Sequence, residues 1–406
     1  MPVSQPVTAP TAEALRQEFL IDPDVVFLNH GSYGATPEPV FAAYQRWQRE
    51  LEWQPVAFLG RRAEELLDGA RATMAAYLGC GRDDLVFVPN ATTGINVVAR
   101  SLPLAPGDEV VGTDLEYGAC DRTWEWFCAK RGARYERAHI PLPLTSPGEV
   151  AEAIFSAVTP RTRAVFLSHV TSGTALRLPV EEVARRARDM GILTMVDGAH
   201  AVGQWPVDLQ ALGVDLYASN FHKWLCAPKG SGFLYAHPDQ QSWLEAPIVS
   251  WGWVEDSDRY RPDAQFVSRN QMQGTRDLAA YLAAPAAVEY QRERDWETVR
   301  ERCHDLAVEA RARIAALSGQ PQIVPVQSPE GYRWFKQMAV APLPDGIDGA
   351  ALKRCLYDEY RVEVPITWSD EHRFIRVSFQ GYNTRDDLEA LMSALEALLP
   401  RMTPVL

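Results

Sequence analysis

The sequence predicts an α/β protein with a mostly parallel sheet in a large domain and a smaller C-terminal α+β domain. Between residues 84 and 236, short apolar runs alternate with helical patterns, as expected for strands joined by crossover helices. From about residue 285 a long charged helix is followed by further strands and helices. The 406 residues also exceed the usual size of one domain. We therefore expect an N-terminal arm at 1–25, a large domain at 26–284 and a small domain at 285–406 that includes the arm.

The first elements are a loose arm, two helices and a strand. Residues 1–11 are rich in Pro, Thr and Ser and predict the arm. Residues 37–53 predict a helix with prolines at its start, and 61–79 predict an amphipathic helix that ends at a glycine. The apolar run at 84–90 predicts a short buried strand, and the next helix opens directly after it at Ala91.

Further apolar runs predict the rest of the sheet and the small domain. The runs that we interpret as strands of the large domain are 108–114, 163–170, 192–200, 214–220 and 230–236, with a helix at 180–191. In the small domain we expect strands at 335–343 and 373–379 and helices at 349–360 and 385–399. Ligands bind at the carboxyl ends of strands in such sheets, so polar residues that directly follow apolar runs are the first candidates for a site.

Charge and cysteine usage exclude several kinds of partner. The chain has 40 basic and 53 acidic residues, a formal net charge of −13 and no Lys/Arg run, so we expect no nucleic-acid partner. The six cysteines show no CxxC pair and no spacing typical of metal ligands, so we expect reduced thiols, no disulfide and no metal site. The N-terminus lacks a basic start followed by an apolar core, and no apolar run is long enough to span a membrane. We therefore expect a cytoplasmic protein without a membrane partner.

One group of polar residues in an apolar setting is the first candidate site. Asp197 ends an apolar run and His200 follows three residues later. One strand further on, Lys223 stands next to His222 in a stretch rich in aromatic residues, where an ammonium ion is costly to desolvate. Covalent chemistry at Lys223 would explain a lysine in this place. The alternatives are a helix cap for Asp197 and a solvated turn for the His-Lys pair.

The stretch 196–235, "VDGAHAVGQWPVDLQALGVDLYASNFHKWLCAPKGSGFLY", resembles the cofactor core of the class V aminotransferase group of fold-type I pyridoxal-phosphate enzymes. The resemblance runs almost end to end, through "FLNHGSYGATP", "NATTGIN", "NQMQGTRD" and "FIRVSFQGYNTRDDLE". Within the group, "LNHGSYGATP", "DLEYGACDR" and "SHVTSGTALRLPV" are most similar to isopenicillin N epimerase and its relatives, with kynureninases and cysteine desulfurases more distant. The resemblance implies a fold-type I transferase with a seven-stranded sheet, pyridoxal 5'-phosphate as cofactor, and a homodimer with shared active sites.

The resemblance assigns three residues to the reactive part of the cofactor. Lys223 matches the lysine that forms the Schiff base with it, and burial would favour the free amine that this requires. Asp197 matches the acid that faces the pyridine nitrogen and keeps it protonated, which makes the ring an electron sink. His200 matches a position near the phenolate oxygen, with a plain packing histidine as the alternative.

Other matched residues would surround the cofactor. Ala91 and Thr92 open a helix whose backbone N–H groups would face the phosphate, although a threonine there is often only a cap. Tyr117 matches the aromatic residue that stacks on the ring face opposite the lysine, and its alternative is a plain surface or core tyrosine. The remaining matches are Asn220 and His222 at the phosphate, Thr171 and Ser172 at the cofactor's edge, and Gly274 and Thr275 from the neighbouring subunit.

A second set of residues is expected to bind the substrate. Arg376 matches the arginine that grips a substrate carboxylate, for which the two-pronged guanidinium is suited. An ordinary ion pair on a strand is its alternative. Asn29, His30 and Tyr33 lie in the N-terminal loop that approaches the site in relatives. We expect the side-chain pocket to be built from the loop at 250–260 and from the N-terminal arm.

The residues favour proton chemistry at the substrate's α-carbon. The loop before the Arg376 strand reads "VEVPITWSDEHR" and lacks the nucleophilic cysteine of desulfurases, while Cys355 lies within a predicted helix and fits packing. An epimerase of an amino acid or small peptide is the leading hypothesis, and it needs a second acid or base besides Lys223, for which Tyr117 and His200 are equal candidates. Alternatives are a C–S lyase, such as those that act on thiol-histidine metabolites, and an aminotransferase. A cofactor-free binding protein would not be expected to keep Asp197, Lys223 and Arg376.

Overall fold

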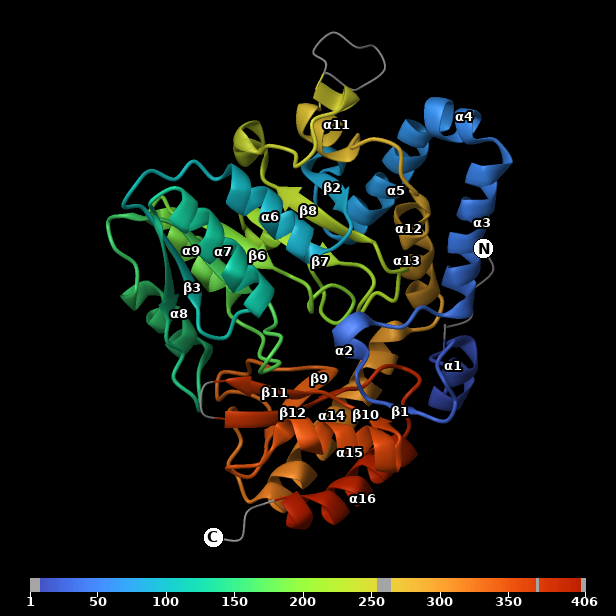
Figure 1. The fold of residues 1–406 in the computed structure, drawn as a ribbon, viewed down its shortest axis with the longest axis vertical. Coiled ribbons are helices and arrows are strands. Elements are labelled where there is room, and N and C mark those ends of the chain that lie inside the picture. Colours follow the sequence, from blue (N-terminus) through green and yellow to red (C-terminus); the bar gives the residue numbers. More distant parts are fainter. Residues whose placement is uncertain (1–7, 254–263, 370–371, 403–406) are drawn as a thin grey trace, which may run out of the picture.

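The computed structural model describes residues 8–253, 264–369 and 372–402, and a seven-stranded sheet forms its centre (Figure 1). The strands follow the order β2-β8-β7-β6-β5-β3-β4. Their bounds are β2 Leu85–Val88, β3 Glu109–Thr113, β4 Arg134–Ala138, β5 Thr162–Ser168, β6 Leu193–Asp197, β7 Leu216–Asn220 and β8 Gly232–Ala236. Strands β4, β3, β5, β6 and β7 are parallel, whereas β8 is antiparallel to both of its neighbours. The predicted α/β fold with a mostly parallel sheet is therefore confirmed.

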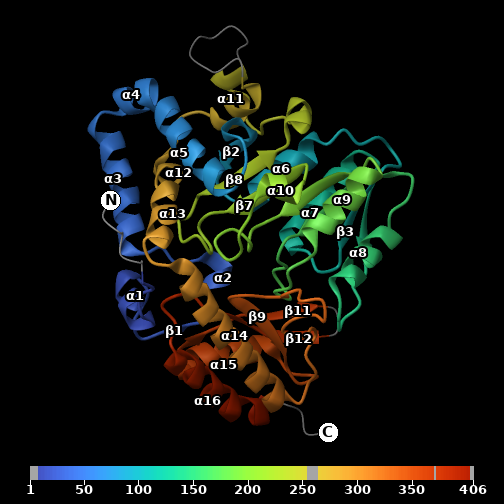
Figure 2. The same cartoon turned by 180° about the vertical axis from the view of Figure 1, so that it is seen from behind.

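Helices cover both faces of this sheet, which explains why most of its strands are continuous apolar runs. Alternate residues of each strand enter two separate cores. Tyr217 of β7 packs in the core beneath α9 (Val180–Asp189), while its neighbour Leu216 packs in the core beneath α6 (Ala91–Ser101). Figure 1 shows α6 and α7 (Gly118–Lys130) on one face, and Figure 2 shows α8 (Pro147–Ser156) and α9 from behind.

The helices at the start of the chain follow the predicted pattern with one local change. Helix α3 spans Glu38–Trp53 after Pro37, and α5 spans Ala63–Tyr77. Residues 61 and 62 of the predicted second helix instead belong to a π-helical turn at Phe58–Arg62. Gly79 ends the second helix with a φ of 63°, a conformation that suits glycine.

A second, three-stranded antiparallel sheet lies below the central sheet in Figure 1. It has the order β11-β12-β9, with β9 at Met338–Pro342, β11 at Ile366–Ser369 and β12 at His372–Ser378. Helices α14 (Trp296–Ser318) and α15 (Gly349–Tyr360) pack against it, and α16 (Arg385–Met402) packs against these two helices. The short strand β1 (Val26–Phe27) pairs with β10 (Val362–Glu363), so the N-terminal segment joins this part of the molecule.

Three of the described strands, β4, β10 and β11, differ from the sequence prediction. Residues 362–373, expected to form a loop, contain β10 and β11. Strand β4 was not predicted because its sequence, RYERA, is polar and partly exposed at the edge of the sheet. The predicted domain boundary at residues 284 and 285 stays a prediction: α13 (Ala284–Arg292) packs against α3 and α5, whereas α14 packs against β9.

None of the helices within the described ranges is both long and apolar enough to span a membrane.

Candidate active site

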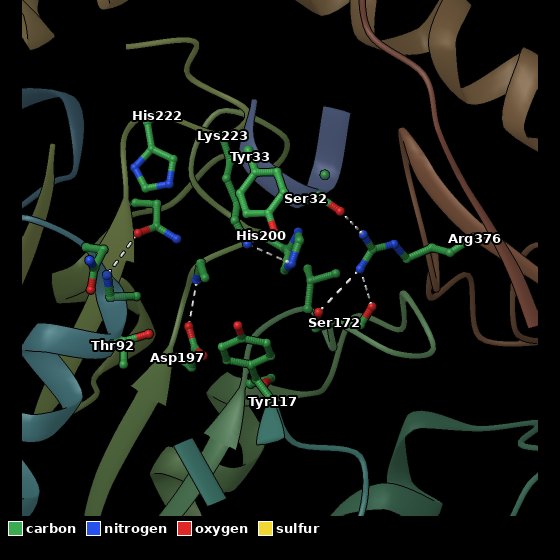
Figure 3. A pocket seen from close by; sticks show the side chains of 17 residues that line it. Ser32, Tyr33, Thr92, Tyr117, Ser172, Asp197, His200, His222, Lys223 and Arg376 are labelled. Atoms are coloured by element: carbon green, nitrogen blue, oxygen red, sulfur yellow. Dashed lines mark hydrogen bonds between the residues drawn. The ribbon is translucent and has the colours of Figure 1, made fainter. Parts of the chain in front are cut away.

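A cavity of about 360 Å³ lies at the carboxyl ends of β5, β6 and β7, where the short helix α2 (His30–Tyr33) and β12 approach the sheet (Figure 3). This size is typical of small-molecule sites. The predicted residues that line it are Tyr33, Ala91, Thr92, Tyr117, Ser172, Asp197, His200, Asn220, His222, Lys223 and Arg376. The lining residues that the sequence did not single out are Gly31, Ser32, Asn90, Ser168, Val170 and Ala199. The fold thus brings together residues from both ends of the chain.

Asp197 is the last residue of β6, and its carboxylate is buried at the floor of the cavity. Its Oδ1 accepts the backbone N–H of Ala199 at 2.9 Å, and its Oδ2 accepts the Cys120 thiol at 3.5 Å. Burial raises the pKa of Asp197, and the positive charge of Lys223 opposes this shift. A cationic group of a ligand at this carboxylate would offset the cost of burying it.

Lys223 lies in the loop that joins β7 to β8, with its side chain directed into the cavity (Figure 3). Its Nζ is 3.1 Å from Nε2 of His200. Burial lowers the pKa of Lys223 to about 8, with Asp197 acting in the opposite direction. Burial also lowers the pKa of His200 well below its usual value. About a tenth of Lys223 is therefore a free amine at pH 7, far more than for an ordinary exposed lysine, and it lies beside an uncharged imidazole.

The first turn of α6 forms one end of the cavity. Asn90 caps this helix by accepting the Thr93 N–H, and Asn220 Oδ1 accepts the Ala91 N–H at 2.9 Å. Among the described residues, neither the N–H nor the hydroxyl of Thr92 has a hydrogen-bond partner. The positive end of the helix dipole and these free donors favour an anion such as a phosphate.

A close approach of α6 to the sheet directs that helix end at the cavity. A Cβ on Gly94 would lie 2.8 Å from the Cβ of Ala218 in β7, so only glycine allows the helix to pack this near. His222 lines the same end of the cavity, and its Nδ1 is 3.2 Å from the carbonyl oxygen of Ser231.

Arg376 enters the other end of the cavity from β12, and it is only 4% exposed. Its Nη1 donates to the carbonyl oxygen of Ser172 at 2.6 Å, and its Nη2 donates to Ser32 Oγ at 3.0 Å. Burial lowers the pKa of Arg376 to about 10. Within the described part of the chain no carboxylate pairs with this guanidinium, and its Nε is buried without a partner. Since a buried cation is costly without a counter-ion, the geometry fits a ligand carboxylate.

Two tyrosines lie at the mouth of the cavity. Tyr117 is the N-cap residue of α7 and is 47% exposed, while Tyr33 ends α2 and is 74% exposed. In Figure 3, Lys223 and Tyr117 enter the cavity from opposite sides. His200 lies on the side of Lys223, because the two side chains are in contact.

Among the predicted site residues that do not line the cavity, three support a neighbour that does. His30 is buried, and its Nε2 donates to the carbonyl oxygen of Lys223 at 2.9 Å. Asn29 Oδ1 accepts the hydroxyl of Ser32 at 2.5 Å. Thr171 contacts Thr174 and the backbone of Leu176 at 2.7 and 2.8 Å, which shapes the loop that carries Ser172.

The remaining predictions lie away from the cavity or outside the described residues. Gly274 and Thr275 are exposed and do not line this chain's cavity, so a contact with the phosphate of a neighbouring subunit stays a prediction. Of the predicted substrate loop at 250–260, residues 254–260 lie outside the described residues, as do residues 1–7 of the arm.

Ser32, Ser168 and Glu116 were missed by the sequence reasoning. Ser168 ends β5 beside Asp197. It could have been predicted, because ligand sites lie at the carboxyl ends of parallel strands. Its hydroxyl donates to the buried Glu116, and burial raises the pKa of that carboxyl to about 8. Ser32 lies in the quoted N-terminal motif but makes its contact with a residue 344 positions away, which no local pattern records.

Residues 26–391 match the family model described as aminotransferase class-V. The chain belongs to this family. It is 38% identical to the isopenicillin N epimerase of Amycolatopsis lactamdurans over 94% of this chain and 97% of that protein. It is also 29% identical to a putative L-cysteine desulfhydrase of Oryza sativa subsp. japonica, over 96% of this chain and 88% of that protein. Among solved structures, a cysteine desulfurase from Escherichia coli superposes with a TM-score of 0.81 at 22% identity, covering 98% of this chain and all of that one.

This class V aminotransferase family member is an enzyme, and its cofactor is pyridoxal 5'-phosphate. The residues present fit that group. The open helix end at Thr92 suits the phosphate, the buried Asp197 carboxylate suits a pyridine nitrogen, and the free amine of Lys223 suits the aldehyde. When bound, the cofactor supplies an electron sink for charge that develops at the substrate's α-carbon.

Side chains of the cavity can bind a substrate carboxylate and transfer protons beside that cofactor. The guanidinium of Arg376 can hold a carboxylate at one end of the cavity, with Ser32 and Ser172 keeping its fork in place. The amine of Lys223 can take or return a proton on its side of the cavity, and the hydroxyl of Tyr117 faces the cavity from the opposite side. These groups together suit an α-amino acid as the substrate class.

Proposed function

We propose that this enzyme epimerises the α-carbon of an amino acid or small peptide, as isopenicillin N epimerase does by its name. The observation that carries the proposal is the pair of proton-bearing groups, Lys223 and Tyr117, on opposite sides of one cavity. Inversion at a carbon requires that a proton leaves one face and another arrives at the opposite face. The epimerase relative, which matches nearly the whole chain, supports the same reaction.

The contacts favour Tyr117 over His200 as the second acid or base. His200 contacts Lys223 and therefore lies on the same side of the cavity. Its imidazole is also buried, and burial keeps its pKa well below the usual value. Tyr117 is half exposed and meets the cavity from the other side. We therefore assign the proton on the lysine side to Lys223 and the proton on the far side to Tyr117.

Tyr117→Phe is expected to separate proton exchange from inversion. In heavy water the parent enzyme should produce the α-epimer of the substrate with deuterium at the α-carbon. The variant should still exchange the α-hydrogen that faces Lys223, whereas inversion should fall by about a hundredfold or more, because a positioned acid or base contributes about that much. Proton NMR of the α-position and chiral chromatography, with isopenicillin N and a panel of free amino acids as substrates, measure both rates.

Tyr33→Phe is the matched comparison, since it removes another hydroxyl at the same cavity mouth. If Tyr33→Phe loses inversion and Tyr117→Phe keeps it, the assignment moves to Tyr33. If the parent enzyme exchanges the α-hydrogen of every substrate without inverting the α-carbon, the epimerase proposal is wrong.

C–S lysis is the second candidate, because a putative desulfhydrase is among the relatives and elimination requires proton removal on only one face. The same assay distinguishes it: elimination from cysteine or a cysteine conjugate releases pyruvate and ammonia, and Tyr117→Phe would leave that rate near the parent value. Formation of a 2-oxo acid with the cofactor left in its amine form would indicate transamination instead.

Arg376→Lys is expected to test the substrate class. The lysine keeps the charge but loses the fork that holds a carboxylate with two parallel hydrogen bonds, so the substrate can pivot. We expect a higher KM and a lower kcat, with kcat/KM reduced by about tenfold to a hundredfold, as for the loss of a charged hydrogen bond. Steady-state kinetics on an α-amino acid and on its amide measure the effect, and cofactor absorbance should stay unchanged.

The amide lacks the carboxylate and provides the control. It should be a poor substrate of the parent enzyme, and Arg376→Lys should reduce its turnover much less than that of the acid. Equal losses for acid and amide would show that Arg376 serves the fold rather than the substrate.

We also propose that the active unit is a homodimer, with Gly274 and Thr275 of each subunit at the cofactor phosphate of the other. Support comes from their exposure and from the open space at Gly274, where an added Cβ would meet no described heavy atom within 4 Å.

A further inference from the structure

Trp224 follows Lys223 directly, yet its indole turns back toward the site and is fully buried. Its Nε1 donates to Nδ1 of His200 at 3.3 Å, on the opposite edge of the ring from the nitrogen that meets Lys223. The two contacts place Trp224, His200 and Lys223 in one line of hydrogen bonds. His200 and Lys223 line the cavity, whereas the indole of Trp224 lies behind them.

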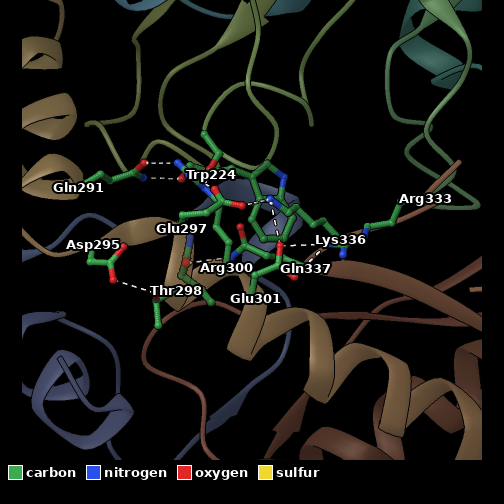
Figure 4. Close-up of polar contacts among 12 residues, drawn as sticks. Trp224, Gln291, Asp295, Glu297, Thr298, Arg300, Glu301, Arg333, Lys336 and Gln337 are labelled. Atoms are coloured by element: carbon green, nitrogen blue, oxygen red, sulfur yellow. Dashed lines mark hydrogen bonds and ion pairs between the residues drawn. The ribbon is translucent and has the colours of Figure 1, made fainter. Parts of the chain in front are cut away.

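The position of Trp224 is held from behind by a polar chain (Figure 4). Gln291 Nε2 donates to the Trp224 carbonyl oxygen at 2.9 Å, and Gln291 Oε1 accepts from Arg300 at 2.9 Å. Because arginine can only donate, the Gln291 amide has one orientation. Arg300 in turn donates to the carbonyl oxygen of Gly203 at 2.8 Å. The backbone that carries the indole is therefore anchored on the side away from the cavity.

Only one assignment of donors and acceptors satisfies both hydrogen bonds between Trp224, His200 and Lys223. An indole nitrogen can only donate, so Nδ1 of His200 must carry a lone pair. A neutral imidazole then has its proton on Nε2, and that proton points at Nζ of Lys223. An ammonium group would place N–H against N–H, whereas a free amine accepts the bond.

We infer that Trp224 is a positioning residue that fixes the tautomer of His200, so that Nε2–H is always presented to the cavity and Lys223 is held as the free amine. The same tautomer serves two states of the enzyme. Before the cofactor is bound, the Nε2–H stabilises the nucleophilic amine; afterwards it is a donor directed at the cavity. The inference concerns Lys223 and its neighbours, so it holds for epimerisation and for C–S lysis alike.

Burial and the neighbouring cations disfavour the charged forms of Lys223 and His200. Burial lowers the pKa of Lys223 to about 8 and Arg376 adds to that shift, while Asp197 and Cys120 oppose it. Around His200, burial together with the charges of Lys223, Arg376 and His222 disfavours the imidazolium. The tautomer is the one property that these charges leave open, and the indole donor decides it.

Nitrogen-15 NMR of the histidine rings tests the tautomer directly. The full chain, with and without pyridoxal phosphate, should show the His200 ring with an unprotonated Nδ1 and a protonated Nε2 at pH 7, and His200→Gln identifies its signals by their loss. In Trp224→Phe the indole donor is gone, and we expect the His200 signals to report both tautomers in exchange. A His200 ring with a protonated Nδ1 in the parent protein would overturn the inference.

The rate at which the cofactor-free chain captures pyridoxal phosphate provides the second readout. In Trp224→Phe we expect capture at pH 7 to slow by about threefold to tenfold and its pH midpoint to rise by about half to one unit, which corresponds to one lost hydrogen bond. The matched control is Trp334→Phe, because Trp334 is also fully buried but its Nε1 has no hydrogen-bond partner among the described residues. Trp334→Phe should keep the parent midpoint.

The two readouts also separate positioning from packing. If Trp224→Phe slows capture but leaves the midpoint and the tautomer of the parent, Trp224 acts only as a core side chain and the inference is wrong. If Trp224→Phe changes both the tautomer of His200 and the pH midpoint of capture while Trp334→Phe changes neither, the indole donor is responsible.

Discussion

Replacing Lys223 with alanine is expected to abolish the covalent link to pyridoxal phosphate and to reduce turnover by about a thousandfold or more, because a nucleophile and a positioned base are lost together. The structure supports a large effect, since the amine is buried and no other lysine lines the cavity within the described residues. Borohydride reduction followed by peptide mass spectrometry should find the cofactor on the peptide that contains residue 223 in the parent and on no peptide in the variant.

Lys229→Ala is the control for this experiment, because Lys229 is the nearby lysine that sequence alone leaves as a competitor. Its side chain lines a different, more apolar cavity of about 430 Å³ with Phe41 and Tyr44. We expect this variant to keep the covalent link and most of its turnover. Retention of the link in Lys223→Ala together with its loss in Lys229→Ala would reverse the assignment.

Asp197→Asn is expected to leave the fold intact and to slow proton removal from the substrate. A neutral amide cannot stabilise a protonated pyridine nitrogen, and a hydrogen bond to a charged group contributes about 1.5–3 kcal/mol, so we expect a loss of about tenfold to a hundredfold in rate. The carboxylate is buried and pairs with no cation of the described chain, which leaves it free for the cofactor. The rate of α-hydrogen exchange in heavy water measures the effect, since it reports proton removal whatever the later steps are.

Asp121→Asn provides the matched comparison on the neighbouring helix α7. Asp121 accepts the hydroxyl of Tyr135 at 2.8 Å and does not line the cavity, so exchange should stay near the parent rate. An Asp197→Asn variant with full exchange activity would show that this carboxylate only caps the turn at Ala199.

The central sheet was predictable because most of its strands are continuous apolar runs. Strands β5, β6 and β7 are covered on both faces, so burial demands continuous apolar runs that can be found without knowing the neighbours. Two edge strands lack such a run: β4 is polar and partly exposed, and β11 lies in a segment whose sequence indicates a loop. The ends of the buried strands then indicated where Asp197 and Asn220 would lie, which is how half of the site could be anticipated.

Local motifs also determined which chemistry the chain supports, whereas tertiary structure decided how the groups are used. The patterns around Asp197, Lys223 and Thr92 are contiguous, so the cofactor core could be identified from the sequence. The contact between Ser32 and Arg376 joins residues at opposite ends of the chain, and the absence of a carboxylate beside that guanidinium in the described residues is a property of the packed cavity.

The sequence by itself therefore indicated the fold class through its apolar runs, and its resemblance to the class V aminotransferase family implied the cofactor and the reactive lysine. The family resemblance already implied that Tyr117 lies opposite the lysine. Only the tertiary structure decided that His200 lies on the lysine's side and that the indole of Trp224 turns back to the imidazole. The physical reason is that the direction of a side chain and the donor or acceptor it meets depend on the packing of distant segments. No spacing along the chain records that packing.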